Sequence, residues 1–114
     1  MSITADMIRG HTETIILAHL LNKDSYGYEI NKSIQTLTAG QYELKEATLY
    51  SAFRRLEEAG YISSYWGDET IGARRRYYSV TPAGRRAHRN SVAEWQDVKT
   101  MIDSLIFTEK ESEQ

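Results

Sequence analysis

The sequence of 114 residues contains no cysteine. A chain without thiols forms no disulfide and offers no thiolate ligand to a metal ion, which is typical of a reducing cytoplasm. Long hydrophobic runs are also absent: the longest, Ile15 to Leu21, is interrupted by His19 and is far shorter than the ~20 residues that cross a bilayer. No cationic start leads into a cleavable apolar segment. We therefore expect a cytoplasmic protein without membrane contact.

The sequence also lacks the common catalytic motifs. It has no P-loop, dinucleotide fingerprint, HExxH pair or plausible triad. We therefore expect no enzymatic activity, no bound metal and no cofactor. At this length a chain buries roughly two thirds of its unfolded surface, which suits a single domain spanning 1–114.

The segment from Glu46 to Gly60 predicts a helix with two different faces. Its apolar residues follow helical spacing and predict one buried stripe, formed by Leu49, Ala52, Phe53 and Leu56. Small, hydroxyl and basic side chains then face outward: Ala47, Thr48, Ser51, Arg54 and Arg55, with Lys45 just before them. Small residues let a helix approach base edges and arginines reach phosphates, so this face is typical of a recognition helix in DNA.

A hairpin is predicted after this helix. Two runs rich in β-formers, Tyr61 to Trp66 and Arg76 to Val80, are joined by a segment with two glycines. Three arginines would make its tip cationic: Arg74, Arg75 and Arg76. Tyr77 and Tyr78 alternate, so one is expected to pack inward and the other to face DNA, and we expect Trp66 in the core of the hairpin.

Helical patterns account for the rest of the chain. We expect helices over Thr4–Leu21 and Tyr26–Leu37, with Ile30 and Ile34 facing the core, and we expect Tyr50 to pack there too. Thr81 followed by Pro82 predicts the start of a last helix that ends near Phe107. The predicted fold is mainly α with a small β-hairpin: a winged helix-turn-helix head over about 4–81, a C-terminal dimerisation helix over about 82–107, and a flexible tail over 108–114.

Charge is unevenly distributed along the chain. The net charge is -2, yet the segment from Lys45 to Arg89 contains nine basic and five acidic residues, a net of +4, so the remainder carries -6. A basic head on an acidic body is the pattern expected of a DNA-binding protein. The alternative is a mixed-charge surface that is simply solvated.

The last predicted helix carries a heptad pattern. His88, Trp95 and Ile102 repeat every seven positions, and Val98 and Leu105 form a second series. Such a seam spans only two to three heptads, so we expect it to form a homodimer with help from the first helix. A symmetric dimer would place two heads on half-sites ~34 Å apart.

Together, these segments resemble the PadR family of transcriptional regulators. The resemblance rests on ILAHLL, YGYEI, EATLYSAFRRLEEAGYI, RRRYYSVTPAG and a final helix with one tryptophan, and within the family the chain is similar to small multidrug-binding members. The resemblance implies that Tyr26 donates to a DNA phosphate, although packing alone is the alternative. It also implies repression of genes by a winged helix that binds double-stranded operator DNA.

Trp95 allows two interpretations. It could be a hydrophobic anchor of the dimer interface, or it could face its symmetry mate and sandwich a planar aromatic molecule between two indoles. The resemblance to multidrug-binding regulators favours the second. Ile8, His11 and Ile15 of the first helix would line the other walls, and Val98 and Lys99 would complete the site. The neighbouring carboxylates Glu94 and Asp97 favour a cationic ligand, whereas the positive charge of Lys99 disfavours one.

The sequence thus predicts a dimeric DNA-binding transcriptional regulator, a repressor that responds to planar aromatic or multidrug-type compounds at the dimer interface. One alternative is a winged-helix module for protein contacts, against which the clustered arginines argue. Another is a DNA-binding regulator without a small-molecule ligand.

Overall fold

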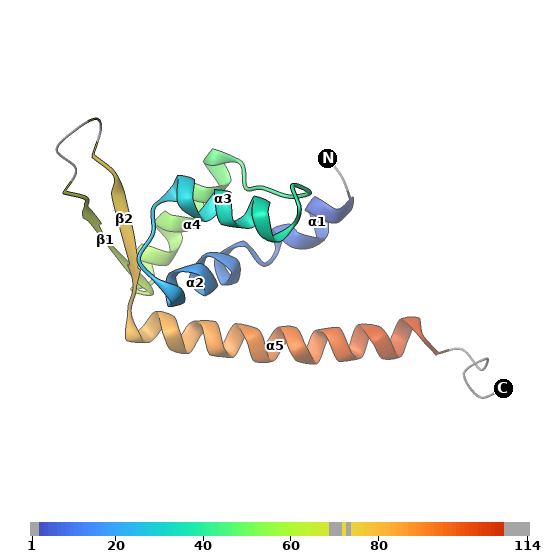
Figure 1. Cartoon of the computed structure of the whole chain (residues 1–114). Helices are drawn as coiled ribbons and strands as arrows, with labels where there is room; N and C mark the ends of the chain where they lie inside the picture. Colours follow the sequence, from blue (N-terminus) through green and yellow to red (C-terminus); the bar gives the residue numbers. More distant parts are fainter. Residues whose placement is uncertain (1–2, 69–71, 73, 109–114) are drawn as a thin grey trace.

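The computed structural model describes residues 3–68, 72 and 74–108, and the predicted tail beyond residue 108 lies outside them. The elements follow in the order α1 (Ile3–Arg9), α2 (Thr12–Asn22), α3 (Gly27–Leu37), α4 (Glu46–Glu58), β1 (Ile62–Trp66), β2 (Arg76–Val80) and α5 (Pro82–Ile106). Helices α1 to α4 form a head, the hairpin stands at one end of it, and α5 runs beneath both (Figure 1). The predicted fold class, mainly helical with a two-stranded hairpin and a long last helix, is confirmed.

The first predicted helix is in fact two helices, so the expected continuous span Thr4–Leu21 is wrong. The chain breaks at Gly10 and His11, because glycine is a poor helix former and the Thr12 hydroxyl donates to the Arg9 carbonyl at 2.8 Å, which satisfies the end of α1. Consequently Ile8 and Ile15 do not share one helical face.

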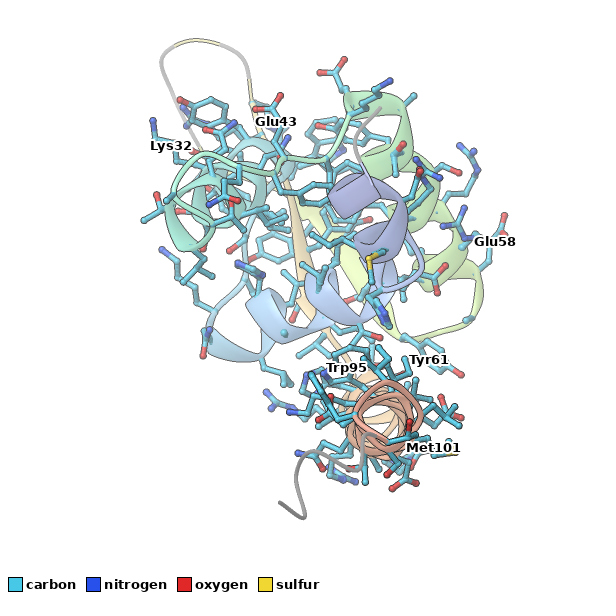
Figure 2. All side chains as sticks on the ribbon, turned by 90° about the vertical axis from the view of Figure 1, so that its right-hand side faces the viewer. Lys32, Glu43, Glu58, Tyr61, Trp95 and Met101 are labelled. Atoms are coloured by element: carbon cyan, nitrogen blue, oxygen red, sulfur yellow. The ribbon has the colours of Figure 1, made fainter. Side chains whose placement is uncertain are left out.

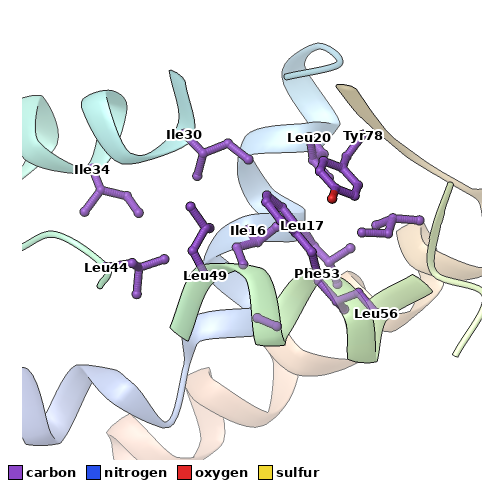
Figure 3. Packing of buried hydrophobic residues seen from close by; sticks show 12 residues of the cluster. Ile16, Leu17, Leu20, Ile30, Ile34, Leu44, Leu49, Phe53, Leu56 and Tyr78 are labelled. Carbon is purple, nitrogen blue, oxygen red and sulfur yellow. The ribbon is translucent and has the colours of Figure 1, made fainter. Parts of the chain in front are cut away.

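The core lies where α2, α3 and α4 meet β2. Figure 3 shows Leu17, Leu20 and Phe53 beside Tyr78 of the hairpin, and Ile30 and Ile34 of α3 toward the other side of the same cluster. The predicted apolar stripe of α4 is buried, and Phe53 stacks on Tyr78 with ring centroids 3.9 Å apart. Ile30 and Ile34 of α3 are buried as predicted. This core fixes α4 by its apolar side and leaves its other side exposed.

The turn between α3 and α4 is held by side chains. Asn31 donates to the Leu44 carbonyl at 2.7 Å and accepts from the Leu44 amide at 2.8 Å, so one amide group satisfies both backbone groups of the residue. The chain reverses through Gly40, whose φ of 78° favours glycine. The start of α4 is therefore set against α3.

The wing extends beyond two strands. β1 and β2 pair antiparallel, and Ser25 forms a further bridge to Tyr78 through two backbone hydrogen bonds, of 3.2 and 2.8 Å. Tyr78 is buried and Tyr77 half-buried, as their alternation predicted. Trp66 is 53% exposed, so its predicted place in the hairpin core is wrong; it belongs to the last residue pair of the ladder, where no core lies beneath it.

Helix α5 is locked to the head at its first turn. Thr81 caps it by accepting from the Gly84 amide at 3.0 Å, and Pro82 occupies the first helical position as predicted. Seen along its axis, α5 meets the head at Trp95 and Tyr61, whereas Met101 points away (Figure 2). Its last turns extend beyond α1 (Figure 1), and the apolar side chains of this end of the helix are exposed.

Candidate nucleic-acid interface

The outer face of α4 is open over its first two turns. Lys45 and Ala47 are exposed and Thr48 is half-buried. Arg54 is exposed as well, and among the described residues neither Lys45 nor Arg54 makes a side-chain hydrogen bond or ion pair. Small groups at the front of α4 and the cation of Arg54 further back are therefore accessible on this helix, with Lys45 just before it.

The Arg55 side chain contacts both Glu13 of α2 and Ser51 of its own helix. The Arg55 Nε lies 2.6 Å from Glu13 Oε2 of α2, and its Nη1 donates to the Ser51 hydroxyl at 2.9 Å. Glu13 is 42 residues away in sequence, and the sequence pattern gave no sign of this pair.

The arginines at the tip end of the hairpin gather on Trp66. The Arg74 and Arg76 guanidinium carbons lie 5.8 and 5.5 Å from the indole centroid. Arg74 also donates to the Gly67 carbonyl at 3.2 Å, and Arg76 donates to Ser64 at 2.7 Å, with Glu57 Oε2 3.7 Å away. The exposed indole of Trp66 thus makes cation–π contacts with two arginines.

A row of aromatic rings joins the wing to the start of α3. The Tyr65 ring stacks on Tyr77 with centroids 5.6 Å apart, and Tyr77 meets Tyr26 edge to face at 5.3 Å. The Arg75 guanidinium carbon lies 4.9 Å from the Tyr26 ring centroid. At the other end, the Tyr65 hydroxyl donates to Asp24 at 2.6 Å. The structure therefore brings together Tyr26, Arg75 and Tyr77, which the sequence predicted separately, and adds Asp24 and Tyr65, which it did not indicate.

The hydrogen bond to Asp24 raises the pKa of Tyr65 from 10.0 to about 12, with smaller contributions from desolvation and nearby charge. Because the folded pKa lies above the unfolded one, the stabilisation is fully present below pH 10 and is lost as pH rises through 12. We expect an alkaline titration followed by tyrosinate absorbance to show one tyrosine whose pKa is higher than those of the others. Tyr65→Phe should remove this titration step, and Asp24→Ala should lower its pKa toward 10. Loss of a normally titrating group in Tyr65→Phe would contradict this assignment.

A small hollow of about 210 Å³ lies between α3 and α4, beside the recognition face. Tyr28 and Lys32, one turn apart on α3, line it and are exposed. Tyr50 lines it too and is 45% exposed, so the prediction that Tyr50 packs in the core is wrong. Its ring meets that of the core residue Phe53 edge to face, with the ring centroids 5.5 Å apart. Tyr28 and Lys32 add an aromatic hydroxyl and a cation that sequence reasoning missed.

A larger groove of about 490 Å³ separates the α1–α2 corner and the end of α4 from α5. The groove is lined by Trp95, His11 and Val98 among others, and the ring centroids of His11 and Trp95 lie 4.9 Å apart. The groove also includes both members of the Glu13–Arg55 pair. Three other predicted ligand residues are not part of this groove within one protomer: Ile8, Ile15 and Lys99.

In the part of the chain that the structure describes, no helix is both long and apolar enough to cross a membrane.

Comparisons with known proteins agree with this geometry. Residues 16–90 match the family model of the transcriptional regulator PadR-like family. A transcriptional regulator from Clostridium thermocellum has a solved structure that superimposes with a TM-score of 0.82, at 50% identity, covering 90% of this chain and 97% of that chain. A PadR family transcription regulator from Clostridium difficile gives 0.72, at 33% identity, covering 84% and 98%. An uncharacterised protein from Lysinibacillus sphaericus is 45% identical over 101 residues, which are 89% of this chain and 93% of the relative.

Proposed function

We propose that this chain, which belongs to the PadR-like family of transcriptional regulators, is a homodimeric repressor whose two winged heads bind two half-sites of an operator. The observation that carries the proposal is the division of the molecule into two surfaces. The outer face of α4 and the basic wing belong to the head, whereas the exposed apolar residues belong to α5. Within the described part of the chain, the two surfaces adjoin only at Arg55, which lines the same groove as Trp95 and Val98. A DNA surface and a dimer surface can therefore be used together.

In this proposal the DNA contacts fall into two groups. Thr48 and Ser51 lie on the outer face of α4 and read base edges in the major groove. Cationic and aromatic groups around them bind the phosphate backbone and set the position of the head: Tyr26, Lys45, Arg54, Arg74, Arg75, Arg76 and Tyr77. Arg55, which the sequence grouped with them, is instead paired with Glu13. The stacking of Arg75 on Tyr26 supports this grouping, because it links the wing cation to the start of α3.

The apolar side of α5 supports the dimer. Trp95, Val98, Met101, Ile102 and Leu105 are between 39% and 76% exposed in the single chain. A contiguous apolar surface of this kind on a helix that continues past its own head is typical of a protein interface. A second copy is the proposed partner because Trp95 and Ile102, and likewise Val98 and Leu105, recur at heptad spacing, which suits helix pairing.

We also propose that a planar aromatic compound binds beside Trp95 and lowers DNA affinity. The groove supports this in part, since Trp95, His11 and Val98 line one concave space with mixed polar and apolar walls. Ile8, Ile15 and Lys99 could join the site only from the partner subunit. Coupling requires that the ligand prefer a dimer geometry in which the two recognition helices are wrongly spaced.

The DNA contacts are tested by comparing a wing variant with recognition-helix variants. We expect Arg75→Ala to weaken binding to all duplexes about equally and to reduce the salt slope by roughly one, since one phosphate contact is lost. Thr48→Ala should change sequence preference and leave the salt slope unaltered. Fluorescence anisotropy with labelled duplexes at several salt concentrations measures both. Unchanged salt dependence in Arg75→Ala would remove the wing from the mechanism, and wild-type protein that binds no duplex would refute the proposed function.

The ligand is tested by tryptophan fluorescence. We expect a planar aromatic compound to quench emission saturably, approaching one ligand per dimer, because two indoles would enclose it. Trp66→Phe removes the other tryptophan and should keep the quenching, whereas Trp95→Ala should abolish it and leave the dimer intact. If a panel of neutral and cationic planar compounds gives no saturable quenching of the Trp66→Phe protein, Trp95 is an interface anchor only.

A further inference from the structure

Arg55 of the recognition helix α4 already makes an ion pair and a hydrogen bond within the protein. Arg55 pairs with Glu13 at 2.6 Å and donates to the Ser51 hydroxyl at 2.9 Å, so its guanidinium lies back along α4 toward the reading face. Arg54, its neighbour, makes no such contact among the described residues. Two adjacent arginines of one helix therefore stand in different electrostatic environments.

The restraint on Arg55 has two consequences for DNA. First, a cation paired with a carboxylate has less attraction left for a phosphate, so the sequence-independent part of binding is smaller. Second, a serine hydroxyl has one donor and two acceptor positions. Arg55 uses an acceptor position, which leaves the Ser51 hydrogen free to donate to a base.

We propose that Glu13 is a specificity-determining residue of DNA binding. By holding Arg55 it withholds one cation from the phosphate backbone and fixes Ser51 as a hydrogen-bond donor. A donor at this point reads an acceptor in the major groove, such as the purine N7 or the thymine O4. The inference rests on the proposed function, because it concerns how the same face distinguishes one sequence from another.

The strength of the pair suits this role. Both side chains are about half exposed, at 53% for Arg55 and 42% for Glu13. Exposed ion pairs contribute little to folding stability, so Glu13 can be changed without loss of the fold. Glu94 provides a matched control, because it is exposed, lines the same groove and makes no hydrogen bond or ion pair among the described residues.

The experiment compares two duplexes, one selected by wild-type protein from a random pool and one of scrambled sequence. We expect Glu13→Gln to bind the scrambled duplex roughly fivefold more tightly and with a salt slope steeper by about one, since Arg55 is released. Its preference for the selected duplex should fall. Glu94→Gln removes the same charge and should change neither slope nor preference.

The double variant decides the mechanism. Arg55→Gln alone should leave the slope on the scrambled duplex unchanged, and Glu13→Gln combined with Arg55→Gln should lose the gain seen in Glu13→Gln. A gain that survives in the double variant, or an equal gain in Glu94→Gln, would mean that net charge alone acts and would overturn the proposal. Wild-type protein that binds neither duplex would instead refute the proposed function, a result that these variants cannot mimic.

Discussion

Ile102→Asp is expected to convert the protein from dimer to monomer and to remove most of its operator affinity. Ile102 is 42% exposed in the single chain and belongs to the proposed seam with Trp95, Val98 and Leu105. In the proposed dimer a carboxylate at this position would be buried without a partner. Breaking the interface in this way costs on the order of 3–5 kcal/mol, which is enough to separate the subunits at working concentrations.

Sedimentation velocity measures this outcome directly. Thr100→Asp is the matched control, because it adds the same charge at an exposed position of α5 outside the two heptad series. We expect Thr100→Asp to remain dimeric and to bind DNA. Intact dimers in Ile102→Asp would refute the pairing of α5 and would leave the exposed apolar row without an explanation.

Gly84→Ala is expected to destabilise the protein by about 3 kcal/mol, at the upper end of the range for overpacking. A Cβ at Gly84 would lie 2.1 Å from the Tyr61 carbonyl oxygen and 2.8 Å from a Val80 methyl carbon. The nearest atom belongs to the backbone, so it cannot move aside by a change of rotamer. The first turn of α5 would have to leave the head.

Denaturant unfolding followed by circular dichroism measures the change. Gly10→Ala serves as the control, because a Cβ there meets no atom within 4 Å and the site is not in the left-handed region. We expect this control to be neutral or slightly stabilising. Equal stabilities of the two variants would show that α5 can shift at its first turn without cost.

Much of the fold could be predicted because it depends on local patterns. The apolar stripe of α4, the alternation of Tyr77 and Tyr78, and the Thr81-Pro82 helix start each reflect a period or a cap within a few residues. Membership of the PadR-like family confirms the prediction of a transcriptional regulator rather than an enzyme. The break at Gly10 was missed because the apolar positions on either side continue one helical period.

The features that sequence reasoning missed join residues far apart in the chain. Glu13 meets Arg55 across 42 residues, and Asp24 meets Tyr65 across 41. Neither pair has a periodic signal, since each depends on the angle at which two elements pack. Trp66 was placed in the core on hydrophobicity alone, whereas the end of a two-stranded ladder has no second layer to cover it.

Because Gly84 packs closely against Tyr61 and Val80, a small rotation at this contact would be amplified along the length of α5. From Gly84 to its end at Ile106, the helix extends about 33 Å, at 1.5 Å per residue. A rotation of about 5° at the junction would displace the far end by roughly 3 Å, which is close to the rise of one base pair. If the far ends pair as proposed, a change of a few degrees where α5 meets the head is enough to move one reading head out of register with the other by a full step of DNA.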